Sequence, residues 1–433
     1  MERTTKQGSS VETKASWIDR SIWTESMLAA LGNGVKGKKW FSLNDKVWRR
    51  STLESAWQQV RSRKGSAGAD DQTIELFAAN ADKYLDELTE SLRNGSYKPQ
   101  AVKRVEIPKG NGKYRPLGIP TVKDRIVQTA IKRVIEPIFE QEFLPMSYGF
   151  RPGKSCKDAL REVDQLLKQG YSYVVDADLE DFFGSIPHER MMEKIEEHIS
   201  DGRLLRLLKA YLKQDIVKGL SGWTPVSGTP QGAVISPLLA NLYLNDLDKR
   251  MQESGYRMVR YADDYVVLCR EEAEAERAMA ELEQWVTNNG LKLHADKTHR
   301  GDCRIPGQGF EFLGYRFEAG QRQVRKKSLQ ALKEKIRSKT RRTRGASLST
   351  IIGELNPLLR GWFGYFKHAR WWTFRPIDQF VRRRLRAILR KQAKRPGMGW
   401  SLQDHKLWPN KYFAEAGLFT MNEAWLTASQ SRC

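Results

Sequence analysis

The chain has 433 residues, 40% of them hydrophobic and 29% charged, which is enough for two or more domains with real cores. No apolar run approaches the ~18 residues of a membrane span, and residues 1–16 are polar, without a signal-peptide segment, so we expect a cytoplasmic protein. Four cysteines and six histidines are scattered without the spacing of a zinc site, which excludes a disulfide framework and a structural zinc module.

The net charge of +22 is concentrated in one part of the chain. Residues 321–400 carry 23 Lys and Arg against three acidic residues, whereas the first 320 residues have a net charge of only +2. Such a block predicts a polyanionic partner, either nucleic acid or an anionic membrane surface. Aromatic residues suited to self-packing and the lack of a lipid-anchor motif favour nucleic acid and argue against a membrane.

The first 50 residues read as a mixed N-terminal extension, and helices are predicted over Leu53–Arg63 and Glu75–Leu92. Residues 102–120 then predict a hairpin around a Gly-Asn-Gly turn, with basic residues that include Lys109 and Arg115. Arg can grip a triphosphate by a bidentate fork and Lys as a point charge. Without further context, a plain basic surface hairpin is the simpler interpretation.

Between residues 124 and 241, apolar segments expected to form the core are followed by polar residues or Gly/Pro-rich loops. An apolar stripe predicts a helix over Asp124–Phe143 that serves the core, and residues 173–178 predict a buried strand that ends in Asp178. Buried carboxylates need a partner or a metal. Residues 228–241 form a Gly/Pro-rich loop that opens an apolar helix, and such turns let a ligand approach the backbone.

Residues 258–268 predict a β-hairpin with Asp263 and Asp264 at its tip, because β-branched and aromatic residues flank the acidic pair. Two adjacent carboxylates repel each other unless a cation neutralises them. Oxygen ligands suit Mg²⁺, and two such ions can clamp the attacking and leaving oxygens of a phosphoryl transfer. A solvated Asp-Asp turn is the alternative, but a strand ending in Asp178 beside this hairpin is what metal-assisted nucleotidyl transfer requires.

The last part of the chain continues with a strand and then basic helices. Lys297 follows a short strand, and Phe310–Phe317 predicts another strand with a central Gly-Tyr pair. Asn356 reads as an N-cap before Pro357, at the start of one helix. A later helix, starting near residue 375, turns its apolar residues inward, so its arginines are expected to line the outer face: Arg382, Arg383, Arg386 and Arg390.

Several blocks in this order resemble the reverse transcriptase family, and within it the bacterial group II intron-encoded reverse transcriptase/maturases. Tyr261-Ala262-Asp263-Asp264 is similar to the YxDD signature of that family. Further blocks are the sequences at residues 115–120, 148–152, 230–232, 236–238 and 312–315, and residues 358–366 resemble the maturase thumb, called domain X. The resemblance extends over about residues 50 to 425.

The resemblance implies an α+β right-hand polymerase. Its fingers and palm, an antiparallel sheet flanked by helices, would span residues 51–320, and an all-α thumb, domain X, would span residues 321–396. Residues 397–433 would form a short tail, a candidate DNA-binding segment, and we expect no HNH endonuclease domain in it.

The resemblance also assigns roles to single residues. Asp178, Asp263 and Asp264 would be the catalytic carboxylates that hold two Mg²⁺ ions, with Mn²⁺ as a substitute; Asp178 and Asp263 would bind metal directly. The incoming nucleotide would contact five residues, Lys109, Arg115, Phe183, Gln231 and Lys297, with Phe183 rejecting a 2′-hydroxyl. The primer grip would be Leu313, Gly314 and Tyr315, and the four arginines of residues 382–390 would bind nucleic acid. One departure is Gly184, where many relatives carry Asp.

The partners implied are group II intron RNA, an RNA template with a DNA primer, dNTPs and target DNA, in a bacterial, nucleoid-associated setting. Whether the protein is a monomer or a homodimer stays open. Two other functions are considered: a splicing-only RNA-binding maturase with a vestigial polymerase site, and a domesticated relative in DNA repair or phage defence. The complete set of acidic and nucleotide-binding residues argues against the vestigial site.

Overall fold

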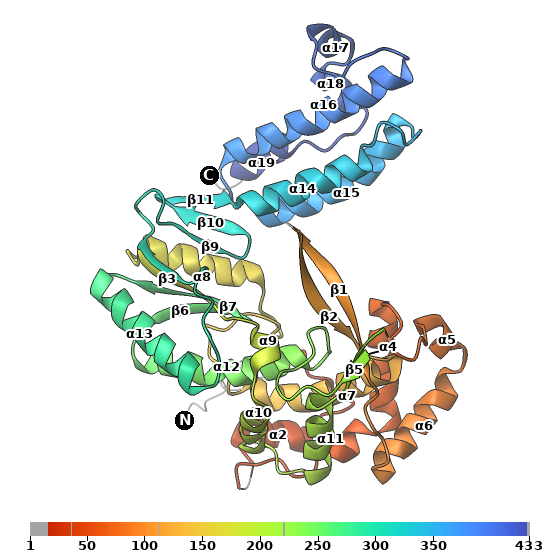
Figure 1. Ribbon diagram of the computed structural model, residues 1–433, viewed down its shortest axis with the longest axis vertical. Helices are drawn as coiled ribbons and strands as arrows, with labels where there is room; N and C mark the ends of the chain where they lie inside the picture. Colours follow the sequence, from red (N-terminus) through yellow and green to blue (C-terminus); the bar gives the residue numbers. More distant parts are fainter. Residues whose placement is uncertain (1–15, 36, 111, 220, 431–433) are drawn as a thin grey trace, which may run out of the picture. The chain divides into compact units, whose positions relative to one another are not determined.

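The computed structural model describes residues 16–35, 37–110, 112–219 and 221–430 and divides the chain into two compact units, residues 1–299 and 300–433 (Figure 1). The division lies about 20 residues before the boundary that the sequence placed between residues 320 and 321. Mixed helices and sheets make the fold class α+β, as predicted. Within the described ranges, none of the helices combines the length and the apolar character needed to cross a bilayer.

The first unit alternates helices with two sheets. Its helices are α2 (Glu25–Asn33), α3 (Asn44–Val47), α4 (Arg50–Arg63), α5 (Ile74–Ala79), α6 (Ala81–Asn94), α7 (Val122–Glu140), α8 (Cys156–Lys168), α9 (Phe182–Ser185), α10 (His188–Glu196), α11 (Gly202–Leu212), α12 (Ser236–Glu253) and α13 (Glu272–Asn288). Its strands are β1 (Val102–Gly110), β2 (Lys113–Ile119), β3 (Tyr173–Asp178), β4 (Ile216–Lys218), β5 (Ser221–Trp223), β6 (Arg257–Tyr261) and β7 (Asp264–Cys269). The unit ends at His299, which is the first residue of β8 (His299–Asp302).

Two sheets organise the first unit. One has the order β2-β1-β4-β5, and its long antiparallel β1–β2 hairpin confirms the hairpin predicted for residues 102–120 (Figure 1). The other has β7 between β6 and β3, with antiparallel pairing on both sides. The predicted hairpin over residues 258–268 is therefore confirmed, and its second strand pairs with the strand that ends in Asp178.

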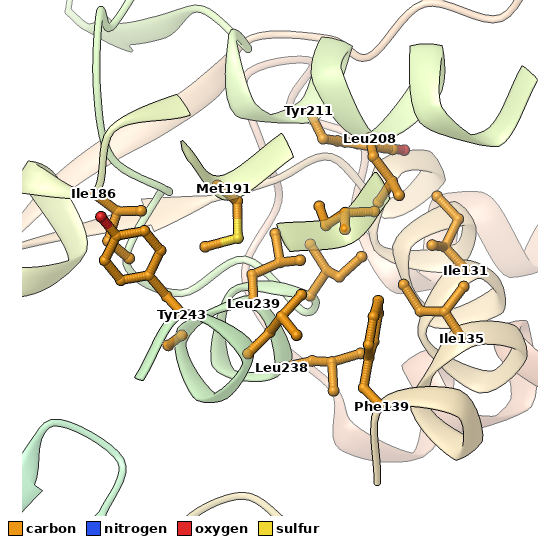
Figure 2. Packing of buried hydrophobic residues seen from close by; sticks show 14 of the residues in the cluster. Ile131, Ile135, Phe139, Ile186, Met191, Leu208, Tyr211, Leu238, Leu239 and Tyr243 are labelled. Atoms are coloured by element: carbon orange, nitrogen blue, oxygen red, sulfur yellow. The ribbon is translucent and has the colours of Figure 1, made fainter. Parts of the chain in front are cut away.

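Apolar side chains from helices α3 to α7 and α9 to α13, with others from strands β3, β6 and β7, form one buried core in the first unit, and Figure 2 shows part of it. The residues labelled in the figure come from α7, α10, α11, α12 and the segment before α10: Ile131, Ile135, Phe139, Ile186, Met191, Leu208, Tyr211, Leu238, Leu239 and Tyr243. The stripe predicted over Asp124–Phe143 is α7, and its apolar residues are buried as expected. The helix predicted over Glu75–Leu92 is instead two helices, because Asn80 leaves the helical conformation at φ −134° between α5 and α6.

The second unit combines a small sheet with helices. Its strands β9 (Phe310–Phe312), β10 (Tyr315–Glu318) and β11 (Gln321–Val324) form an antiparallel sheet with β10 in the centre. Its helices are α14 (Lys326–Lys339), α15 (Leu348–Phe366), the 3-10 helix η1 (Trp371–Thr373), α16 (Phe374–Gln392), α17 (Leu402–Leu407), α18 (Asn410–Glu415) and α19 (Met421–Gln430). Buried residues of α14, α15 and α16, such as Ile336, Leu355 and Leu385, form its apolar interior.

The single strand predicted over Phe310–Phe317 is wrong. Phe312 pairs with Tyr315 across a two-residue turn, so the segment is a hairpin of β9 and β10. Leu313 and Gly314 both have positive φ, 46° and 84°, as a two-residue hairpin turn of this kind requires at both central positions. The alternating apolar pattern continued through the turn and hid it.

The helix start predicted at Asn356 is also wrong. The helix α15 begins eight residues earlier, at Leu348, where the Ser347 hydroxyl accepts a hydrogen bond from the Thr350 backbone N–H at 3.2 Å. Pro357 therefore lies inside α15. The Asn356 side chain binds another segment instead, donating to the Gly417 carbonyl and accepting from the Phe419 N–H, both at 2.8 Å.

Leu239 offers a direct test of the core in the first unit, because its side chain is only 1% exposed. We expect Leu239→Ala to lower the free energy of unfolding by about 2–5 kcal/mol, from lost burial and the cavity that remains. Urea denaturation followed by circular dichroism measures the change. Leu76→Ala, at a side chain 58% exposed, is the control and is expected to change it by less than about 0.5 kcal/mol; equal losses at the two sites would contradict this packing.

Candidate active site

The pairing of β3 with β7 brings two of the predicted catalytic carboxylates together. Asp178, the last residue of β3, lies directly opposite Asp264, the first residue of β7. Side chains of directly opposed residues lie on the same face of a sheet, with Cβ atoms about 4.5–5.5 Å apart. Two residues that are far apart in the sequence therefore present their carboxylates side by side at one end of the sheet.

Asp263 lies beside this pair, in the two-residue turn that joins β6 to β7. Burial raises the pKa of Asp263 above its usual range, and the nearby negative charge of Asp178 raises this pKa further. Arg115 and Arg260 act in the opposite direction and lower the pKa. The three carboxylates thus form a site in which negative charge is costly and a cation would be favourable.

Lys297 supplies one cation at this site, since its ammonium group forms an ion pair with the Asp178 carboxylate. The backbone of residues 292–298 follows the end of β3: the Asp178 carbonyl accepts from the His294 N–H at 2.8 Å, and Leu179 forms a β-bridge with Leu293. The strand predicted before Lys297 is only this isolated bridge. Although the predicted strand is absent from this segment, the Lys297 ammonium group contacts the Asp178 carboxylate.

The basic hairpin contributes a second cation. Arg115 on β2 is exposed, and its positive charge lowers the pKa of Asp263. The backbone of Lys109 belongs to β1, but its side chain lies outside the described residues. Its predicted contact with a triphosphate therefore stays a prediction.

Phe183 and Gln231 line one pocket of about 140 Å³ in the first unit. The other lining residues come from the β1–β2 hairpin, the segment around α9, β4 and the loop before α12: Val102, Arg104, Pro116, Gly118, Asp181, Gly184, Ile216, Pro225, Ser227, Gly228, Thr229 and Pro230. Two of the five residues expected to contact a nucleotide thus share a cavity, although their sequence positions are 48 residues apart.

Close backbone contacts hold the walls of this pocket together. The Gly118 N–H donates to the Gln231 carbonyl at 2.6 Å, and the Thr229 N–H donates to the Phe183 carbonyl at 2.7 Å. A Cβ at Gly228 would lie 2.6 Å from the Phe183 carbonyl oxygen, so only glycine permits this approach. The hairpin, the loop before α12 and the segment that carries Phe183 are therefore fixed to one another.

Sequence reasoning missed the buried polar residues behind the Asp263 turn. The Arg260 guanidinium, 0% exposed, donates to both carboxylate oxygens of Asp248 and to the Asn241 and Ala262 carbonyl oxygens. The backbone of Gly149 packs on the same turn, so that an added Cβ would lie 2.3 Å from the Ala262 nitrogen. A signal was present, because strand alternation places Arg260 on the core-facing side, where a charged residue is exceptional.

The predicted primer-grip residues all lie at the β9–β10 turn of the second unit. The Leu313 carbonyl accepts a hydrogen bond from the Tyr365 hydroxyl at 2.8 Å, and Gly314 packs against Phe366. Tyr315 is fully buried, and its hydroxyl donates to the Tyr365 carbonyl at 2.6 Å. Leu313 and Gly314 are half-buried, whereas Tyr315 anchors the turn to α15.

The expectation that four arginines of α16 line an outer face is wrong for Arg386. Its side chain is 2% exposed and donates to the Trp408 carbonyl and the Asn410 side chain. Arg390 forms an ion pair with the buried Asp404, and burial lowers the pKa of Arg382. Of these four arginines, Arg383 is the one whose guanidinium stacks on an exposed ring in the described part of the chain, 4.4 Å from the centre of Trp400. The tail after α16 folds back on this face, where it buries Arg386 and pairs with Arg390.

The described residues contain no group of three or more His, Cys, Asp or Glu side chains arranged to hold a metal ion by themselves. This result is compatible with Mg²⁺, which is commonly bound through one or two carboxylates, waters and substrate phosphates and not by an all-protein cage. Asp178 and Asp264, directly opposed, with Asp263 at the turn, provide donors of that type.

Comparison with known proteins identifies the family. A model described as reverse transcriptase (RNA-dependent DNA polymerase) matches residues 107–317, and one described as group II intron, maturase-specific domain matches residues 329–408. Protein YkfC of Escherichia coli is 34% identical over 307 residues, which are 61% of this chain and 79% of that protein. The group II intron-encoded protein LtrA of Lactococcus lactis is 37% identical over 197 residues, 45% of this chain.

The chain belongs to the group II intron reverse transcriptase/maturase family. Its fold is accordingly that of a right-hand reverse transcriptase followed by a helical domain. The aligned segment is only 32% of the length of LtrA. The turn that carries Asp263 lies within the reverse transcriptase match, as do all residues that line the pocket except Val102 and Arg104, and α16 lies within the maturase match.

Gly149 tests whether the Asp263 turn must keep its position. Since a Cβ there would lie 2.3 Å from the Ala262 nitrogen, Gly149→Ala must shift the turn, and a displacement of about 1 Å can lower a catalytic rate about 10²-fold. Primer extension on an RNA template measures this loss in kcat. Gly202→Ala is the control, because its Cβ would meet its nearest atom at 3.7 Å; a Gly149→Ala rate equal to that of the control would contradict the close packing.

Proposed function

We propose that this protein copies RNA into DNA by metal-dependent nucleotidyl transfer and binds group II intron RNA to assist splicing. The observation that supports the polymerase most strongly is the β3–β7 register, which sets Asp178 opposite Asp264 with Asp263 at the adjoining turn. Carboxylates in this arrangement suit the transfer of a nucleotide to a primer 3′-hydroxyl, in which charge builds on the phosphate and the leaving pyrophosphate.

The carboxylates fit divalent cations. Asp178 and Asp263 would hold two Mg²⁺ ions directly, Asp264 would support them, and Mn²⁺ would be a substitute. Burial raises the pKa of Asp263 and the Asp178 charge raises it further, so the negative charge of Asp263 is costly here and a bound cation would offset this cost. When bound, these ions would activate the 3′-hydroxyl and stabilise the leaving pyrophosphate.

The other residues of the site position the nucleotide. Arg115 and Lys109 would bind the triphosphate of a dNTP, and Lys297, now paired with Asp178, would face the leaving pyrophosphate as a proton donor. In the adjoining pocket, Phe183 would pack under the sugar and exclude a 2′-hydroxyl, and Gln231 would contact the nucleotide and the template.

A second function, binding intron RNA, is favoured by the maturase-specific match over residues 329–408 and by the basic character of this segment. Phosphate contacts by Lys and Arg would supply most of the affinity for folded RNA and for a template–primer duplex. Arg383 with Trp400 combines a cation with an exposed ring, a pairing suited to a nucleic-acid surface. Target DNA would be a further partner.

Removing one catalytic carboxylate tests the polymerase. We expect Asp263→Asn to lower dNTP incorporation on an RNA template with Mg²⁺ by about 10³-fold, because loss of metal-assisted charge stabilisation is worth several kcal/mol. Steady-state primer extension measures the rate. Glu180→Gln, a matched change at an exposed side chain two residues after the end of β3, is the control and is expected to retain activity.

The same variant separates the two functions. Asp263→Asn is expected to bind intron RNA and support its splicing as well as the parent protein does, since the carboxylates take no part in phosphate contacts. If the parent protein makes no DNA with Mg²⁺ or Mn²⁺ but supports splicing, the polymerase proposal is wrong and the splicing-only function remains. A protein that binds no intron RNA would contradict the maturase function.

Phe183 tests the sugar discrimination of the pocket. We expect Phe183→Ala to raise the kcat/KM for rNTPs relative to dNTPs by about 10- to 100-fold, the range that small changes in pocket shape produce. Single-nucleotide incorporation with each nucleotide type measures the ratio. Phe41→Ala, at a ring 73% exposed, is the control; an unchanged ratio in Phe183→Ala would show that another residue excludes the 2′-hydroxyl.

A further inference from the structure

The turn that carries Asp263 has an unfavourable backbone conformation. Ala262, the first of its two central residues, has a φ of +59°. Glycine is strongly preferred at this position of a two-residue hairpin turn, because a Cβ makes positive φ costly. Strained residues of this kind persist only when the surrounding structure determines their conformation. The conformation of Ala262 therefore depends on the contacts that the rest of the protein makes with this turn.

Arg260 makes the principal side-chain contact with this turn. Its Nη1 donates to the Ala262 carbonyl at 2.9 Å and to the Asn241 Oδ1 at 2.9 Å, while its Nε donates to the Asp248 Oδ1 at 2.7 Å. The ion pair between Arg260 and Asp248 is 0% exposed on both sides. Because Asn241 and Asp248 both belong to α12, the helix fixes the guanidinium, and the guanidinium in turn holds the Ala262 carbonyl.

Arg260 and Asn241 also connect the turn to the loop after α7. The backbone of Arg260 pairs with the loop after α7, accepting from the Tyr148 N–H at 2.8 Å and donating to the Met146 carbonyl at 2.9 Å. The Asn241 side chain donates to the Gly149 carbonyl at 2.7 Å, and Gly149 packs directly on the Ala262 nitrogen. The turn is thus bracketed between Arg260 and Gly149.

Stability alone does not account for the buried pair. Replacing a buried ion pair with apolar residues of similar size is often neutral or stabilising, because both charges must be removed from water. Burial indeed raises the pKa of Asp248 even though Arg260 lies against it. An apolar pair in place of Arg260 and Asp248 would leave the Ala262 carbonyl without the hydrogen-bond donor that Arg260 provides.

We propose that Arg260 is a positioning residue, which holds the strained turn so that Asp263 and Asp264 stay aligned with Asp178. The proposal rests on the polymerase function. Arg260 lies opposite Tyr265 in the sheet, and Asp178 lies opposite Asp264, so the guanidinium and the carboxylate pair are on opposite faces. Arg260 therefore acts on the carboxylates through the backbone of the turn.

The first test compares Arg260→Lys with Arg133→Lys. Lysine keeps the charge but lacks the planar fork that reaches several acceptors at once. Arg133 is the matched control, since it also donates to a carboxylate and to neutral side chains, Asp19, Ser55 and Gln59, but has no contact with the turn. We expect both variants to lose thermal stability, and only Arg260→Lys to lower kcat, at least tenfold, with the KM for dNTP within twofold of the parent value.

Hydrogen exchange gives a readout that needs neither metal nor substrate. We expect the peptide that spans residues 258–268 to exchange at least tenfold faster in Arg260→Lys than in Arg133→Lys. If the parent protein makes no DNA, the proposed function fails, and the exchange result still decides whether Arg260 orders the turn. Equal exchange in the two variants, or equal kcat, would overturn the proposal.

A rescue experiment tests the strain directly. Glycine adopts positive φ freely, so adding Ala262→Gly to Arg260→Lys is expected to restore most of the lost kcat; no recovery would contradict the role given to the strained turn. If Arg260→Lys does not fold, the double variant Arg260→Met/Asp248→Leu removes both charges and is expected to fold with the same loss of kcat. A double variant with parent kcat would overturn the proposal.

Discussion

The antiparallel pairing of β3 with β7 is the constraint on which the rest of the site depends. Its register places Asp178 opposite Asp264, and because side chains alternate along a strand, a shift of one strand by one residue would turn its carboxylate to the opposite face and separate the pair. The same alternation directs Arg260 and Tyr265 toward the buried face. One pattern of backbone hydrogen bonds thus places the carboxylates on one face of the sheet and the buried Arg260, which contacts the turn, on the other.

Around this sheet, segments from distant parts of the sequence are joined by backbone contacts that leave no room for larger side chains. Gly118 and Phe183 are each hydrogen bonded to the loop before α12, and Gly149 packs on the turn beside Asp263. Such contacts fix the pocket lined by Phe183 and Gln231, and the turn that carries Asp263, through the backbone itself. The positive charges of Arg115 and Lys297 then offset part of the repulsion among the carboxylates.

The sequence was sufficient where chemistry depends on short motifs. The hairpin with Asp263 and Asp264, the strand that ends in Asp178 and the basic β1–β2 hairpin all have the predicted type of structure. Predictions failed where distant contacts override a local pattern. Pro357 lies inside α15 although a helix start was predicted there, apolar alternation hid the turn at Leu313, and Arg386 is buried by the tail that returns over α16. The roles of the individual site residues remain predictions.

The central claim is that carboxylates from two distant segments hold the same metal ions. Iron(II) substituted for Mg²⁺, in the presence of ascorbate and peroxide, generates radicals that cleave the backbone close to the bound metal. The account predicts two sets of fragments in the full-length protein, one from cleavage near Asp178 and one near Asp263, both suppressed by excess Mg²⁺ and both lost in Asp178→Asn. Cleavage near only one of these segments, or a pattern that Asp178→Asn leaves unchanged, would contradict it.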